Sequence, residues 1–176
     1  MSKLNARTIV ALVAAGLFAV VAVTAGLVAF AVSKAPAHNP KLTAYAHGTT
    51  ITVDPFMYCT VRMENCRYGE TAPLAVPAGE PVQLSLPDAI SQSPWLIQLI
   101  YQRPSGEQLD RVLSFADYPD RARALTIESN PEPGLRLSGI EVQLPILARD
   151  IATGRETYVP HAAWSIVTPE PEPREP

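Results

Sequence analysis

Hydrophobic and polar residues follow two different patterns along the chain, and the first is an unbroken apolar run near the N-terminus. Residues 9–32 contain no charged side chain, and Thr24 is their only hydroxyl. At 1.5 Å rise per residue, a helix over this run spans about 36 Å, enough to cross a hydrocarbon core of about 30 Å with some tilt. The pattern predicts one transmembrane helix over residues 9–33.

A cleaved secretory signal is the competing interpretation of the apolar run. Signal peptides have a shorter apolar core of about 7–15 residues, so the length favours an uncleaved anchor. The small residues Ala35-Pro36-Ala37 suit cleavage after Ala37, which leaves that alternative open. Because Lys3 and Arg7 precede the run and positive charge stays in the cytoplasm, residues 1–8 are expected inside and the domain after the run outside the cell membrane.

The apolar run also carries small residues at alternating spacings of four and three, which place them on one helix face. Small side chains let neighbouring helices approach closely, so this face is predicted to contact another membrane protein. Because the segment is rich in alanine, such a stripe is also expected by chance, without any partner helix. The residues of this face are Ala15, Ala19, Ala22, Gly26 and Ala29.

The second pattern begins after a spacer over residues 34–40, where apolar and polar residues alternate with a period of two. Short runs of this kind, separated by turns rich in Pro, Gly and Asp, predict seven to nine strands. The runs cover residues 42–46, 50–53, 57–63, 82–86, 94–101, 112–115, 125–127, 135–144 and 157–167. A mainly β domain with an immunoglobulin-like β-sandwich over residues 41–168 is therefore expected, with a β-barrel as the alternative.

Several local features complete the expected architecture. Trp95 is expected to be a core aromatic on a central strand, because the run around it is apolar on both faces. Residues 118–124 are expected to form one helical turn. Residues 169–176 alternate Pro with acidic residues and predict a disordered tail. The 18 prolines of the chain fit many short strands and turns better than long helices.

Charge narrows the range of partners. Three of the 14 Lys and Arg residues flank the apolar run, which leaves 11 basic against all 17 acidic residues in the rest of the chain. This acidic balance argues against nucleic acid, which needs clustered basic residues, and it provides no polybasic patch for anionic lipid. The membrane itself and another membrane or envelope protein are the expected partners, with lipid as a further possibility.

Cys59 and Cys66 are the only cysteines in the chain. On the outer, oxidising side of a membrane, two nearby cysteines favour a disulfide. Structural zinc needs four ligands, and only His47 and His161 are available to join the two cysteines, so the sequence favours the disulfide over a metal site.

The chain carries no recognised catalytic or cofactor motif, so a non-enzymatic role without a cofactor is expected. A triad drawn from Asp88, Ser91 or Ser93 together with His161 is the weakest alternative. Most aromatic residues are expected in the core, whereas Tyr118 and Tyr158 lie near turns and are expected to be exposed.

The chain combines an alanine- and valine-rich anchor with the stretch V-P-A-G over residues 76–79, L-S-L-P over residues 84–87 and the pair Pro94-Trp95. Together these features resemble an uncharacterised family of actinobacterial envelope proteins, related to those of mycobacteria and nocardiae. The resemblance implies a membrane-anchored extracytoplasmic protein and transfers no activity or site residue. The sequence therefore predicts a non-enzymatic accessory or interaction protein of the cell envelope. A lipid or glycolipid binding module of envelope transport is the alternative, and a hydrolase is the third.

Overall fold

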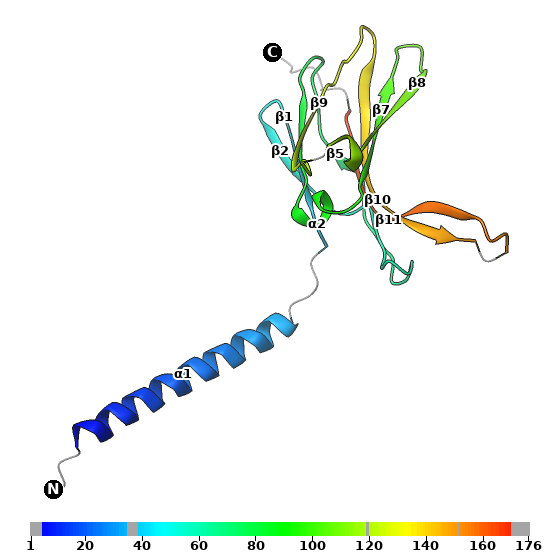
Figure 1. Cartoon of the computed structure of the whole chain (residues 1–176). Helices are drawn as coiled ribbons and strands as arrows, with labels where there is room; N and C mark the ends of the chain where they lie inside the picture. The colour runs from blue at the N-terminus through cyan, green and yellow to red at the C-terminus, as the bar shows by residue number, and fades with distance from the viewer. Residues whose placement is uncertain (1–4, 35–38, 119, 151, 170–176) are drawn as a thin grey trace. The chain divides into compact units, whose positions relative to one another are not determined.

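The computed structural model describes residues 5–34, 39–118, 120–150 and 152–169, in two separate units over residues 1–38 and 39–176. The possible cleavage site Ala35-Pro36-Ala37, residues 1–4 of the expected cytoplasmic end and residues 170–176 of the expected tail lie outside the described residues. Figure 1 shows the two units.

The first unit is a single helix, α1 (Ala6–Lys34), whose section Thr8–Ser33 has a mean hydropathy of 2.5. Two of its hydroxyls, those of Thr24 and Ser33, have hydrogen-bond partners within the helix. Thr24 donates to the carbonyl of Val20 at 2.6 Å, and Ser33 donates to the carbonyl of Phe30 at 2.8 Å. The helix is long and apolar enough to cross a membrane, as predicted, although an N-terminal signal sequence would pass the same test.

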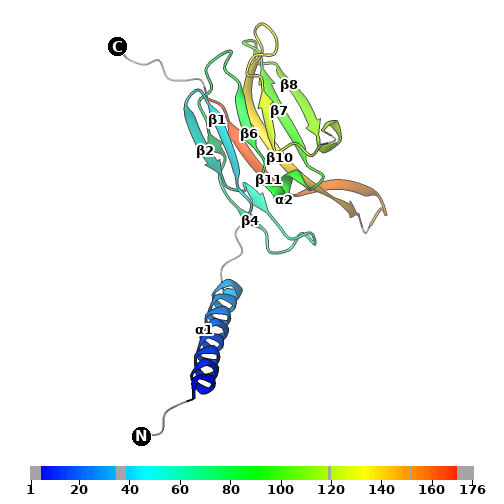
Figure 2. The same ribbon diagram turned by 60° about the vertical axis from the view of Figure 1, so that its left-hand side comes forward.

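The second unit is mainly β, as predicted, and its strands form two separate sheets (Figures 1 and 2). The four-stranded sheet has the order β2 (Thr49–Val53), β1 (Leu42–Ala46), β6 (Val82–Ser85) and β9 (Ala124–Ile127). The larger sheet has the order β4 (Arg67–Tyr68), β3 (Met57–Tyr58), β11 (Glu156–Val167), β10 (Arg136–Arg149), β7 (Leu96–Gln102) and β8 (Gln108–Ser114), and β5 (Ala72–Pro73) adds to β11 in parallel. Two sheets rather than one closed sheet exclude the β-barrel.

The strand order is that of an immunoglobulin-like sandwich. Strands β1, β6 and β9 occupy the places of A, B and E in one sheet, and β7, β10 and β11 occupy those of C, F and G in the other. The connections from β6 to β7, from β8 to β9 and from β9 to β10 each cross between the sheets. Strand β2 extends the first sheet, and β3 and β4 extend the second beyond β11.

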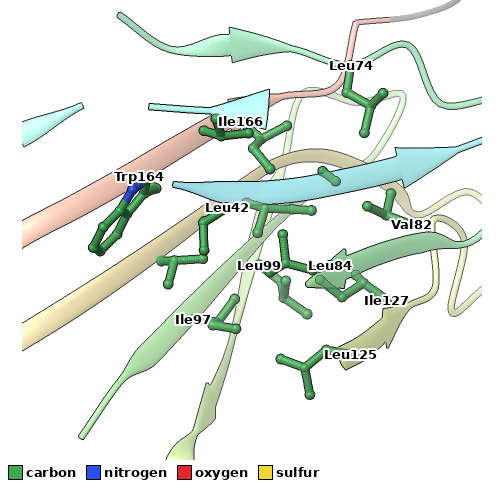
Figure 3. Packing of buried hydrophobic residues seen from close by; sticks show 14 of the residues in the cluster. Leu42, Leu74, Val82, Leu84, Ile97, Leu99, Leu125, Ile127, Trp164 and Ile166 are labelled. Atoms are coloured by element: carbon green, nitrogen blue, oxygen red, sulfur yellow. The ribbon is translucent and has the colours of Figure 1, made fainter. Parts of the chain in front are cut away.

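The core lies between the inner faces of the two sheets and follows from the period of two. In β1, alternate residues are fully buried, and β7 repeats the same pattern. Figure 3 shows apolar side chains from both sheets meeting in this space. They include Leu42, Leu84, Leu99, Leu125, Trp164 and Ile166.

The structure differs from the secondary structure predicted from the sequence at three places. The strand expected over residues 57–63 ends at Tyr58, because the chain turns there toward the second cysteine. No helical turn covers residues 118–124 among those described. A 3-10 turn forms earlier, at Phe115–Asp117, where the Asp117 carboxylate accepts from the backbone N–H and the hydroxyl of Ser114 at 2.8 and 2.9 Å. The short helix α2 (Asp88–Ser91) had no signal in the periodicity.

Replacing Leu84 by Ala tests the core directly. Leu84 is buried in β6, between β1 and β9, so Leu84→Ala removes contacts and leaves a cavity. We expect the free energy of unfolding to fall by about 3 kcal/mol. Urea titration of the full chain in mild detergent measures it through Trp95 and Trp164, both of which are fully buried. The neighbouring exposed Gln83→Ala should change it by about 0.5 kcal/mol or less, and equal effects of the two variants would contradict the assigned faces.

Candidate functional site

The most unusual feature of the sandwich is that β10 and β11 continue past their neighbours. Strand β7 pairs with β10 only as far as Gln143, and β3 pairs with β11 only at Ala162 and Ala163. Beyond these points β10 and β11 pair with each other alone, as far as Arg149 and Glu156. We refer to residues 145–160 as the arm; Figure 1 shows it as the orange ribbon that projects from the sandwich.

Two prolines mark the base of the arm. Pro145 and Pro160 lie opposite each other, directly after a register shift that leaves His161 as an extra residue in β11. Neither proline has an N–H, so neither could donate a hydrogen bond to a further strand. The sheet therefore narrows to two strands at this point.

The tip of the arm is held by hydrogen bonds around Asp150. Its carboxylate accepts from the backbone N–H groups of Ala152 and Thr153 at 2.8 and 2.9 Å, and these donors hold the pKa of Asp150 below its usual range. The backbone N–H of Asp150 donates to the carbonyl of Arg155 at 2.8 Å. Because the turn has its own hydrogen bonds, the arm keeps a defined hairpin shape without a third strand.

The arm exposes apolar side chains on its outer face. Leu147 lies opposite Tyr158, and these side chains are 57% and 71% exposed. The pair Ile146 and Val159, on the opposite face, is half-buried. Since an isolated two-stranded hairpin is marginally stable in water and exposed apolar patches mark interaction sites, the arm has the character of a contact surface.

A disulfide joins Cys59 to Cys66, as the sequence predicts, and closes a loop beside the base of the arm. The backbone N–H of Cys59 donates to the carbonyl of His161 at 2.7 Å, and His161 Nδ1 lies 3.1 Å from the carbonyl oxygen of Cys59. We call residues 59–66 the disulfide loop. It exposes two further apolar side chains, Val61 and Met63.

The same outer face continues from the arm onto the larger sheet. By the strand register, Tyr68 lies opposite Met57, and Met57 lies opposite Ala163 on the side away from the core. Tyr68 is 74% exposed. The disulfide loop and β4 are therefore joined to the base of the arm through β3 and β11, although they are distant from it in the sequence.

The residues of the weak hydrolase alternative have other partners. His161 faces the Cys59 carbonyl, the Asp88 carboxylate pairs with Arg123 at 2.9 Å, and the Ser93 hydroxyl donates to the carbonyl of Ala89 at 2.8 Å. The hydroxyl of Ser91 is buried and has no hydrogen-bond partner within the described chain. No hydrogen bond in that part of the chain links His161 to Asp88, Ser91 or Ser93.

The metal alternative finds no support in the described ranges, where no group of three or more His, Cys, Asp or Glu residues is placed to hold a metal ion. Both cysteines are used by the disulfide.

Two hollows lie at the other end of the sandwich, among loops. One, of about 540 Å³, is lined in part by Arg103 and Arg136, and the other, of about 420 Å³, lies beside it and shares Asn130. Arg103 faces the carboxylates of Glu107 and Glu132, and Arg136 donates to the carbonyl of Thr168 at 2.9 Å. Because both guanidinium groups already have partners, these hollows are poor candidates for an anionic ligand.

Asn130 has a structural role between the two hollows. It accepts from the Gly79 N–H at 2.8 Å and donates to the carbonyl of Leu135 at 2.9 Å, which ties two loops together.

Of the exposed aromatics expected from the sequence, only Tyr158 is confirmed. Tyr118 is half-buried, because its ring packs against Trp95 with centroids 5.7 Å apart. Trp95 is fully buried, as predicted, but it precedes β7 instead of lying on it. A signal for the longer strand was present in the sequence, because the alternation of Val142 and Leu144 continues to Ile146.

The class of protein defined by these observations is an immunoglobulin-like sandwich preceded by an apolar helix that could span a membrane. The comparisons with known proteins then identify the family. A family described as "Protein of unknown function (DUF2771)" matches residues 35–169, and this chain belongs to it. Uncharacterised proteins of Mycobacterium tuberculosis and Mycobacterium bovis are 38% identical over 131 residues, which cover 73% of this chain and 76% of theirs. No solved structure matches the chain.

The family and its mycobacterial members agree with the expected resemblance to an actinobacterial family without an assigned activity. The match covers the sandwich domain and begins after α1, so it carries no information on membrane anchoring.

Removing the disulfide should loosen the loop beside the arm. In the double variant Cys59→Ser, Cys66→Ser, the unfolded chain regains the freedom of the closed loop, which should lower the free energy of unfolding by about 2 kcal/mol. Urea titration of both proteins, with and without a thiol reductant, measures this. Reductant should lower the stability of the wild type to that of the variant and leave the variant unchanged. Equal stability under all conditions would show that the contacts with His161 alone hold the loop.

Proposed function

We propose that this protein is a non-enzymatic interaction protein of the cell envelope, anchored by α1 with its sandwich on the outer side of the cell membrane. The observation that carries the proposal is the arm, which exposes Leu147 and Tyr158 on a hairpin without neighbouring strands. Such a ribbon adds little to the stability of the sandwich but offers apolar side chains and free backbone edges to another molecule.

Anchoring and orientation are supported by the sequence and by α1. The helix extends over Ala6–Lys34, longer than the apolar core of a secretory signal, and the hydroxyls of Thr24 and Ser33 bond within the helix. Lys3 and Arg7 lie on the N-terminal side of the apolar run, which favours a cytoplasmic N-terminus. The Cys59–Cys66 disulfide fits the oxidising outer side.

The alternative of a binding pocket for lipid or glycolipid has less support. The hollows of about 540 and 420 Å³ lie among loops, and the guanidinium groups that line the larger one are already paired. The surface of the arm, in contrast, is both apolar and exposed.

The anchor is tested by the intact mass of the protein isolated from membranes of an actinobacterial host. We expect the mass of a chain that keeps residues 9–33, because the apolar run is longer than a cleavable core, and we expect the protein to stay in the membrane pellet after carbonate washing. A mass that begins after Ala37, together with release into the wash, would contradict the anchor. The variant Ala35→Leu, Ala37→Leu, which blocks cleavage at that site, should leave the mass otherwise unchanged.

Contact through the arm is tested with a photoreactive phenylalanine analogue at position 158. Tyr158 is exposed, so the probe should not disturb folding. Irradiation of whole cells should give an adduct with an envelope component, protein or lipid, at position 158 and not at Ser105, which is exposed at the other end of the sandwich. Equal yields at both positions, or none at position 158, would contradict the proposal.

The small-residue face of α1 is a separate part of the proposal. A Cβ added at Gly26 would meet nothing within 4 Å in the chain itself, so Gly26→Leu creates no clash within the chain. If the face binds another membrane protein, Gly26→Leu should reduce the co-purification of that protein in mild detergent, whereas Val28→Leu, on the opposite side of the helix, should not. Unchanged co-purification would remove this part of the proposal and leave the arm untouched.

A further inference from the structure

The arm and the disulfide loop lie at the end of the sandwich where the chain enters it. Trp164 Nε1 donates to the carbonyl of Pro40 at 2.9 Å, which fixes the start of the domain beside β11. Trp164 is only two residues along β11 from Ala162, and Ala162 pairs with Tyr58, the residue before the disulfide loop. We call this the proximal end, and Figure 2 shows the arm and the loop that follows β3 projecting there.

The covalent chain limits how far the proximal end can move from a membrane that contains α1. Even when fully extended, the stretch from Lys34 to Pro40 reaches at most about 20 Å. The arm strand from Pro145 to Arg149 extends about 15 Å beyond its base, at about 3.3 Å per residue. The arm is therefore comparable in length with the maximum reach of the tether.

The side chains exposed at the proximal end have the chemistry of the interfacial region of a bilayer. Tyrosine combines an apolar ring with a hydroxyl and is enriched at membrane–water interfaces, and Tyr158 is one of the most exposed aromatics of the domain. Leu147 lies opposite it, and Val61 and Met63 extend from the disulfide loop. Together these residues provide an amphipathic ring and three aliphatic or thioether groups.

Both acidic and basic side chains accompany this apolar group. Glu64 is exposed in the disulfide loop and Asp150 at the tip of the arm. Arg62, Arg67 and Arg155 are exposed, and none of them has a carboxylate within 4 Å among the described residues. Guanidinium groups at a membrane surface bind the phosphates of lipid headgroups and attract anionic lipids. The three arginines are too few for a polybasic patch. They would orient the domain on the lipid, while the apolar side chains make the main contact.

From these observations we propose that the arm and the disulfide loop dock on the outer lipid surface of the membrane that holds α1. Leu147 and Tyr158 enter the interfacial region together with Val61 and Met63, and the free arginines lie among the headgroup phosphates. The sandwich is then held in one pose on the lipid, with its hollows at the end farthest from the contact. The inference rests on the proposed function, because it requires that α1 stays in the chain.

The test uses the full chain in vesicles of phosphatidylethanolamine and phosphatidylglycerol, labelled with the environment-sensitive dye NBD. The dye is attached to a cysteine introduced by Tyr158→Cys or, as the matched control, by Ser105→Cys at the other end of the sandwich. With the label at position 158 we expect blue-shifted NBD emission and strong quenching by lipids that carry a nitroxide near the headgroup. With the label at position 105 we expect neither. Equal quenching at both positions would overturn the proposal.

A second variant keeps the proposal testable if the dye itself attracts the arm to lipid. This variant is Leu147→Asp, with the dye attached at Val61→Cys. Loss of one apolar contact should lower the ratio of docked to undocked protein about tenfold. The measured sign of this change is the loss of nitroxide quenching at position 61. Leu147→Ile should retain the quenching. Urea midpoints within error of the wild type are expected for both, because position 147 is exposed. Quenching that survives Leu147→Asp would overturn the role of the arm.

The outcomes separate the lipid assignment from the proposed function. Adducts between position 158 and a protein, without nitroxide quenching, would overturn docking on lipid and leave the anchored interaction protein standing. A chain shortened after Ala37 would overturn the proposed function whatever the dye reports.

Discussion

Backbone pairing between β10 and β11 connects the inside of the sandwich to the tip of the arm, and the rest of the structure depends on it. In the inner half of this ladder, Val142 and Trp164 face the core, and β7 and β3 complete the sheet on either side. In the outer half the same two strands continue alone. The register of the inner half buries Trp164, and the shift at His161 then sets which side chains of β11 the arm presents, since a shift by one residue exchanges the two faces.

Most strands of the sandwich could be predicted from the sequence, but only part of the candidate site. Alternation from Leu42 onward predicted the strands and the core, because one buried face per strand leaves a clear period of two. The pairing of Cys59 with Cys66 followed from compartment and spacing. The projection of the arm beyond its neighbours could not be predicted, because an exposed ribbon has the same alternation as a half-buried strand. Only its neighbours decide between them, and these come from β7 and β3, which are remote in the sequence.

The arrangement divides the domain into a stable body and an exposed contact surface. Fully buried residues from both sheets supply the body, and the arm needs only its own turn and its pairing to keep its shape. His161 joins the two parts, because it is the extra residue at the base of the arm and also binds the disulfide loop through Cys59. Family members of unknown function in mycobacteria therefore offer a direct comparison for the exposed positions of the arm.

Exchange of the arm for a tight turn tests this division most directly. In the full chain, residues 145–160 are replaced by Asn-Gly, which together with His161 forms a three-residue hairpin connection between Leu144 and Ala162. The urea titration should give a free energy of unfolding within about 1 kcal/mol of the wild type. Photoreactive probes on the remaining surface should not yield the envelope adduct that is expected at the arm. A variant that fails to fold, or one that keeps its adducts in full, would contradict the account in which the arm serves contact and the sandwich serves stability.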